Sequence, residues 1–169
     1  MDIKNSKTAR LVLTGMLAAA ALAVSFFERT AAGLLALPPG IKPGLSNIIV
    51  MFVCSALGLF AALATALIKS GFVFLISGAA AGFISLCGGV LSVAVMYLLI
   101  KHMKKLSFSG ISVISAVSHN MGQLFAASLI AGSPLYLAWA PALLISAVIF
   151  GLITGTILNC VMPAIEKKF

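Results

Sequence analysis

The chain is a succession of long apolar runs, separated by short segments that carry charges, glycines or prolines. Apolar runs of this kind favour membrane helices, because a chain in lipid must satisfy its own backbone hydrogen bonds. The expected helices span residues 11–27, 45–59, 61–80, 82–100, 108–131 and 135–161. We therefore predict an all-α integral membrane protein in which residues 1–169 form a single transmembrane domain, a six-helix bundle.

The stretch from residue 45 to residue 100 allows two interpretations, either two long helices hinged at Lys69-Ser70-Gly71 or three shorter ones. Basic residues precede the first helix, within residues 4–10, and follow the fourth, within residues 101–105. Because basic residues collect on the cytoplasmic side, an even number of crossings must separate these two clusters. Charge therefore favours three helices in this stretch, with both termini of the chain in the cytoplasm.

Composition supports a membrane protein. Hydrophobic residues make up 62% of the chain and charged residues 8%, and the mean hydropathy is +1.22. Soluble domains have roughly 45–50% apolar and 25% charged residues. The net charge of +8 lies mostly at the ends of the apolar runs, which indicates membrane orientation rather than nucleic-acid binding.

A cluster of polar residues interrupts the apolar run from residue 111 to residue 131. His119, Asn120 and Gln123 lie close together there, and His119 and Gln123 share one helix face. Ser112 and Ser115 continue that face. Polar groups in hydrocarbon are costly unless they have partners, so this face should point towards protein, water or a ligand. The alternative is that these side chains only hydrogen-bond neighbouring helices.

Lys69 falls near the middle of the third expected helix, roughly 12 Å from either end. Its side chain is too short to reach the membrane surface comfortably from there. We expect Lys69 to point into the bundle, where it would contact an anion or pair with Glu28 or another buried group. Under the two-helix interpretation, Lys69 would instead be a loop residue.

A second polar segment surrounds Lys42. Residues 38–44 contain three prolines and two glycines, which exclude a regular helix. Lys42 lies on this stiff turn, and Ser46 and Asn47 begin the next helix. Lys42 and Asn47 are therefore candidates for the mouth of a binding site, although capping of the helix would also explain Ser46 or Asn47.

The chain lacks the residues that several kinds of catalysis and cofactor binding require. The three acidic residues, Asp2, Glu28 and Glu166, are far apart, which argues against carboxylate dyads and Mg²⁺-dependent diphosphate chemistry. The chain has no nucleotide-binding loop of the Gly-x-x-x-x-Gly-Lys-Ser/Thr type, and its cysteines and histidines lack metal-site spacing. We expect a binding protein without cofactor or metal, not an enzyme.

Two motifs carry a resemblance to a known family. Pro39-Gly40-Ile41-Lys42-Pro43-Gly44-Leu45-Ser46-Asn47 and His119-Asn120-Met121-Gly122-Gln123 resemble the bacterial Gx transporters, often labelled heptaprenyl diphosphate synthase component I. The chain departs from the family pattern at Pro43, where a small aliphatic residue is usual, and at Lys69, where the family tends to carry arginine. The second departure keeps the positive charge but not the fork geometry of arginine.

The resemblance implies a function, because this family is similar to the substrate-binding (S) components of energy-coupling-factor transporters. Those proteins are six-helix bundles in the bacterial cytoplasmic membrane that work with a transmembrane coupling subunit and two ATPases. They dock through small residues on the first helix, a role that Gly15, Ala19 and Ala23 would take here. Without the resemblance, this stripe of small residues indicates only close packing.

The leading expectation is a membrane uptake component that binds a small, anionic or amide-rich solute. Lys42 and Asn47 would lie at the mouth of the cavity, with Lys69, His119, Asn120 and Gln123 further in. The synthase label implies a different role, a non-catalytic membrane subunit that presents a lipid substrate to a soluble prenyl synthase. A third possibility is a scaffold of a membrane complex, in which the polar cluster is structural.

Overall fold

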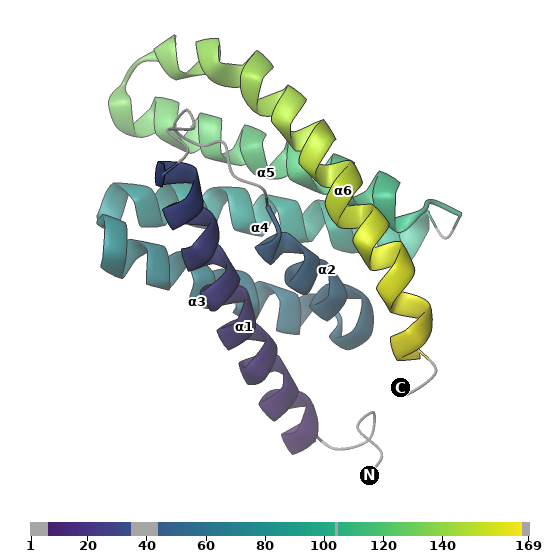
Figure 1. Cartoon of the computed structure of the whole chain (residues 1–169). Helices are drawn as coiled ribbons and strands as arrows, with labels where there is room; N and C mark the ends of the chain where they lie inside the picture. Colours follow the sequence, from purple (N-terminus) through teal and green to yellow (C-terminus); the bar gives the residue numbers. More distant parts are fainter. Residues whose placement is uncertain (1–6, 35–43, 104, 167–169) are drawn as a thin grey trace.

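The computed structural model describes residues 7–34, 44–103 and 105–166. These residues form six α-helices and one short 3₁₀-helix. In chain order they are α1 (Lys7–Leu34), α2 (Ser46–Leu57), α3 (Leu59–Ser77), α4 (Ala79–His102), α5 (Phe108–Ala131), η1 (Pro134–Trp139) and α6 (Ala140–Glu166). The helices α3, α4 and α5 run side by side, and α1, α2 and α6 cross over them (Figure 1). The start of α1 and the end of α6 lie towards the same end of the molecule (Figure 1).

Five of these helices are long and apolar enough to cross a membrane, namely α1, α3, α4, α5 and the segment Leu137–Pro163. The protein is thus an all-helical, multi-pass membrane protein. The exception is α2, which has 12 residues and a length of about 18 Å, less than the roughly 30 Å of hydrocarbon in a bilayer. It contacts α1, α3, α4 and α6, so protein surrounds it on several sides.

The stretch from residue 45 to residue 100 contains three helices, and single glycines join them. Gly58 has a φ of 90° and Gly78 a φ of 85°, a conformation that favours glycine. Most ends of these three helices differ by two or three residues from the predicted ends. The predicted third helix, for example, ran through Gly78 to residue 80, whereas α3 ends at Ser77. Lys69 lies inside α3, so it is not a loop residue.

The first helix is longer than the sequence predicted. It extends from Lys7 to Leu34 instead of residues 11–27, and Thr30 donates a hydrogen bond to the carbonyl of Phe26 at 3.1 Å. The alanine-rich sequence after Arg29 favours continued helix over the expected connection. Glu28 is therefore not at the end of a helix, and its side chain is 5% exposed. The last helix begins later than expected, after the 3₁₀-helix η1.

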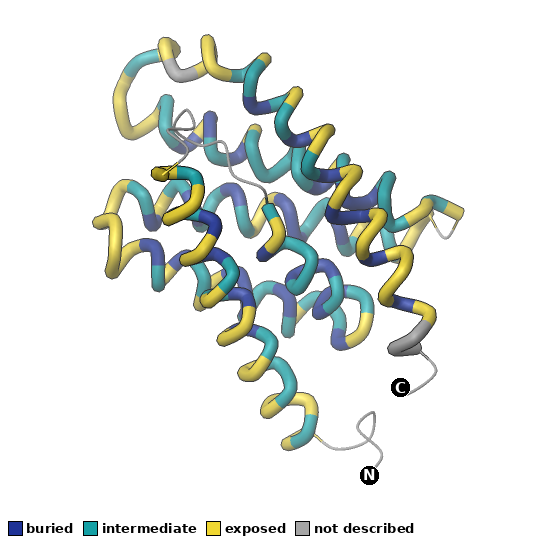
Figure 2. Tube along the Cα trace, viewed as in Figure 1, coloured by how far each residue is buried: buried dark blue, intermediate teal, exposed yellow. Residues whose placement is uncertain are grey.

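Glycines allow α5 to approach its two neighbours closely. A Cβ at Gly122 would lie 3.0 Å from the carbonyl oxygen of Cys87 on α4. A Cβ at Gly155 on α6 would lie 2.4 Å from the Cα of Ser109 on α5. Helices in lipid associate through such close packing, since lipid tails provide no hydrophobic drive. The buried faces point inward and the outer faces are largely exposed (Figure 2), as expected where lipid covers the bundle.

We expect Gly155→Ala to destabilise the protein by about 1–3 kcal/mol, because the new methyl group would overlap the backbone of α5. Gly71→Ala is the matched control, since a Cβ at this helical position meets nothing within 4 Å. Thermal unfolding of both variants in the same detergent, followed by size-exclusion chromatography, measures the difference. Equal stability of the two variants would contradict the close contact between α5 and α6.

Candidate functional site

A cavity of about 70 Å³ lies between the helices, and residues from all six α-helices line it. Polar residues outnumber apolar residues in its lining, and residues with hydroxyl groups are the most frequent among them. A smaller cavity of about 20 Å³ adjoins it and shares Asn47, Lys69, Ser85, Ser92, Met96 and His119. A polar hollow in the interior of a membrane bundle has room for ordered water or for part of a ligand.

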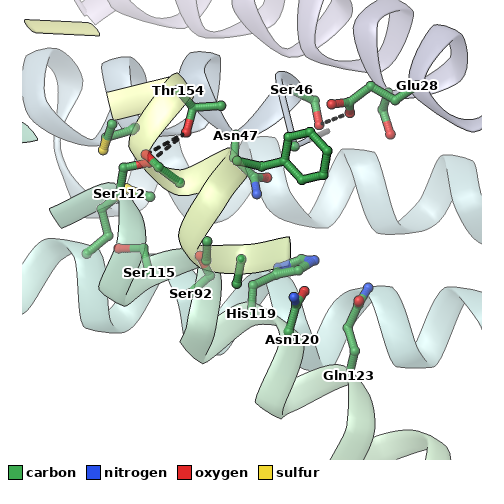
Figure 3. Close-up of a pocket in the computed structure, with 18 of the residues that line it drawn as sticks. Glu28, Ser46, Asn47, Ser92, Ser112, Ser115, His119, Asn120, Gln123 and Thr154 are labelled. Atoms are coloured by element: carbon green, nitrogen blue, oxygen red, sulfur yellow. Dashed lines mark hydrogen bonds between the residues drawn. The ribbon is translucent and has the colours of Figure 1, made fainter. Parts of the chain in front are cut away.

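At one end of the cavity, hydrogen bonds connect α1, α2 and α3. Ser46 donates from Oγ to the Glu28 carboxylate at 2.8 Å, and Lys69 donates from Nζ to Ser46 Oγ at 2.9 Å. Lys69 Nζ also donates to Asn47 Oδ1 at 3.0 Å. Ser46 thus links the Glu28 carboxylate to the Lys69 ammonium. The side chains of Ser46 and Asn47 are members of this hydrogen-bond network (Figure 3).

The same carboxylate stabilises the start of α2. Glu28 accepts a hydrogen bond from the backbone N–H of Leu45, the residue before the first turn of α2. A negative charge is favourable there, because the first N–H groups of a helix have no partner within it and carry the positive end of the helix dipole. Glu28 therefore has two roles, as the cap of α2 and as the acidic member of the network.

At the other end of the cavity, hydroxyl groups from α5 and α6 face one another. Ser112 and Thr154 are hydrogen-bonded at 2.7 Å. Ser115, one helical turn from Ser112, is 2% exposed and lines the cavity. Its Oγ has no hydrogen-bond partner in the described part of the protein. A buried hydroxyl without a partner is costly, so water or a ligand group is expected beside Ser115.

The polar cluster of α5 lies between these ends. His119, Asn120 and Gln123 line the cavity and extend from one helix in Figure 3. Asn120 also has a structural role, because its Nδ2 donates to the carbonyl of Leu143 on α6 at 2.8 Å. Gly88 on α4 leaves space for the side chains of His119 and Gln123, since a Cβ at Gly88 would lie 2.6 Å from Gln123 Cγ and 3.2 Å from His119 Cε1.

The structure brings together five of the six residues that the sequence suggested for binding. Asn47, Lys69, His119, Asn120 and Gln123 all line the cavity. The sixth, Lys42, lies outside the described residues. The candidate docking residues Gly15, Ala19 and Ala23 are on the exposed surface of α1, away from the cavity.

Sequence reasoning named Glu28 as a possible partner of Lys69, to which Ser46 links it, but did not include Glu28 among the residues that line the cavity. Its signal was a single acidic residue within a predominantly apolar segment, which in a membrane helix indicates an inward-facing group. It also missed Ser85, Ser92 and Thr154, because isolated hydroxyl residues are common in membrane helices and give no distinctive pattern. Among the described residues, no three His, Cys, Asp or Glu side chains gather into a metal site.

The comparisons with known proteins give one match. The family model for heptaprenyl diphosphate synthase component I matches residues 17–161. No curated protein and no solved structure matches the chain. The matched segment contains α2 to α5 and η1, most of α1 and α6, and all the described residues that line the central cavity. The chain therefore belongs to the heptaprenyl diphosphate synthase component I family.

Proposed function

We propose that the protein is the membrane substrate-binding component of an energy-coupling-factor-type uptake transporter. Its ligand is a small solute with an anionic group, of the size of a micronutrient or metabolic precursor. A transmembrane coupling subunit with two ATPases provides the energy, since the chain has no nucleotide-binding loop of its own. The protein functions in the bacterial cytoplasmic membrane.

The observation that carries this proposal is the Ser115 hydroxyl, which is buried, faces the cavity and has no partner in the described structure. A purely structural polar cluster would satisfy its own groups, as Ser112 and Thr154 do. An unsatisfied hydroxyl in a cavity instead favours an exchangeable occupant, which is the property that a binding protein needs.

The charged residues that line the cavity indicate which kind of ligand it could bind. Lys69 is the cation expected to attract an anionic group, but Glu28 lines the same cavity and is linked to Lys69 through Ser46. An anionic ligand therefore competes with Ser46 and Asn47 for the Lys69 ammonium. We favour a solute with one carboxylate or phosphate group and further polar groups for the hydroxyl-lined end, because a highly charged anion would be repelled by Glu28.

The cavity is small for a micronutrient-sized ligand. Small-molecule sites usually have volumes of roughly 300–1,000 Å³, whereas this cavity has about 70 Å³. A micronutrient-sized ligand thus requires the helices to move apart, and a transporter must open its site in any case. The exposed positions of Gly15, Ala19 and Ala23 leave this part of α1 accessible for a coupling subunit.

The second candidate is a non-catalytic membrane subunit of isoprenoid or quinone metabolism, which the family description favours. In that role, the protein presents a prenyl lipid to a soluble synthase. The polar lining of the central cavity fits a polyprenyl chain poorly, because an apolar chain cannot hydrogen-bond its many hydroxyl groups.

The partner distinguishes the two functions. We expect the tagged protein, purified from its own host in mild detergent, to retain a coupling subunit and two ATPases that mass spectrometry can identify. The variant Gly15→Leu/Ala19→Leu/Ala23→Leu should lose them, because leucine side chains prevent close helix approach. The control Ala20→Leu/Ala31→Leu alters another exposed part of α1 and should retain them. Recovery of a soluble prenyl synthase without ATPases would favour the second function.

Ser115→Ala should reduce the affinity for the transported solute by about 2- to 10-fold, the contribution of one neutral hydrogen bond. Ser128→Ala is the matched control, since Ser128 Oγ is also buried on α5 without a partner but does not line the cavity. The measurement is the amount of solute that co-purifies with each variant, determined by mass spectrometry. Equal retention by both variants would exclude Ser115 from the site.

We expect Glu28→Gln and Lys69→Gln each to destabilise the protein by about 1–3 kcal/mol, because each leaves buried polar partners poorly satisfied. The double variant should lose less than the sum, since both substitutions act on the network through Ser46. A double-mutant cycle of thermal stability in detergent measures this coupling. Additive effects would mean that Glu28 and Lys69 are energetically independent.

A further inference from the structure

A third, larger hollow lies at the end of the bundle where α1 begins. It has a volume of about 370 Å³ and lies between the first two turns of α1, the joint between α2 and α3, and Tyr97 of α4. We call it the N-terminal groove. It shares no lining residue with the central cavity, so it is a separate feature of the described structure.

Basic groups line one side of the N-terminal groove. Lys7 and Arg10 are three residues apart on α1 and therefore lie on the same helix face. Arg10 is held in place, because one of its terminal nitrogens donates to the carbonyl of Leu57 at 2.7 Å. Lys101 adds a third cation near the groove, with its Nζ 5.8 Å from the centre of the Tyr97 ring.

Among the described side chains, no acidic group lies near this positive charge. Of the acidic side chains that the structure describes, Glu28 alone is present, and it lies 18 positions further along α1, roughly 27 Å from Arg10. The start of α3, with the positive end of its dipole, and the end of α2, with the negative end, both line the groove, and Arg10 already pairs with the Leu57 carbonyl of α2. The groove is thus electrostatically suited to an anion.

Other residues that line the groove are apolar and exposed. Leu11 is 73% exposed and Phe60 88% exposed, and both line the hollow. In a membrane these surfaces contact acyl chains. A ligand that fits both the basic and the apolar residues has a phosphate group joined to a hydrocarbon chain. Arginine suits phosphate especially well, because its guanidinium can donate two parallel hydrogen bonds to it.

We propose that the N-terminal groove binds an anionic phospholipid. The phosphate of the headgroup contacts Lys7 and Arg10, and an acyl chain lies along Leu11 and Phe60. Basic pockets between membrane helices are suited to such headgroups. Lys7, Arg10 and Leu11 precede the segment that the family model matches, residues 17–161, whereas Phe60 and Tyr97 lie within it. The proposal does not rest on the proposed function.

Native mass spectrometry of the full-length protein in detergent tests the proposal, with phosphatidylglycerol and phosphatidylcholine as competing probes. We expect one phosphatidylglycerol to bind with at least about tenfold preference. Lys7→Gln/Arg10→Gln should weaken that binding by about 30-fold, since each basic residue near a headgroup contributes about a factor of five. The control Lys105→Gln removes an exposed charge that does not line the groove and should keep the lipid.

Two further measurements keep the test decisive. Because Arg10 also holds the Leu57 carbonyl, Lys7→Glu provides a variant that leaves Arg10 in place, and it should weaken binding by at least fivefold. Millimolar inorganic phosphate should not displace the lipid, since phosphate has no acyl chain for Leu11 and Phe60. Equal binding of both lipids, equal losses in the variants and the control, or displacement by inorganic phosphate would each overturn the proposal.

Discussion

The burial of opposite charges inside a membrane bundle is the constraint on which this structure depends. An isolated ion in a low-dielectric interior is very costly, so a buried carboxylate and ammonium persist only with hydrogen-bond partners. Glu28 and Lys69 meet that requirement through Ser46 and Asn47. The network fixes α1 and α3 relative to the start of α2, and the central cavity is located beside it.

The short helix α2 is central to this arrangement. It is too short to span the hydrocarbon, yet it contributes Met51 and Val53 to the core and contacts four other helices. Its position depends on the Glu28 carboxylate at its start and on Gly58 at its end. A short helix held by protein contacts can carry polar groups such as Asn47 into the middle of the bundle, where a lipid-facing helix could not.

Close helix packing and the polar cavity are complementary requirements. Gly88 and Gly122 bring α4 and α5 together, and this lets His119 and Gln123 pack against a glycine surface while they line the cavity. The hydrogen bond from Asn120 to the Leu143 carbonyl connects α6 to the polar cluster of α5. Helix packing and the lining of the cavity therefore depend on the same residues.

The sequence by itself determined the helical class and most of the helix positions, because long apolar runs and basic clusters obey the local rules of the bilayer. It also singled out five residues that line one cavity, since polar side chains in apolar runs must point inward. Only the tertiary structure decided that Ser46 links Glu28 to Lys69, and that Ser115 Oγ has no hydrogen-bond partner among the described residues. Those facts depend on how separate helices pack together, and no local pattern encodes which side chains meet across a cavity.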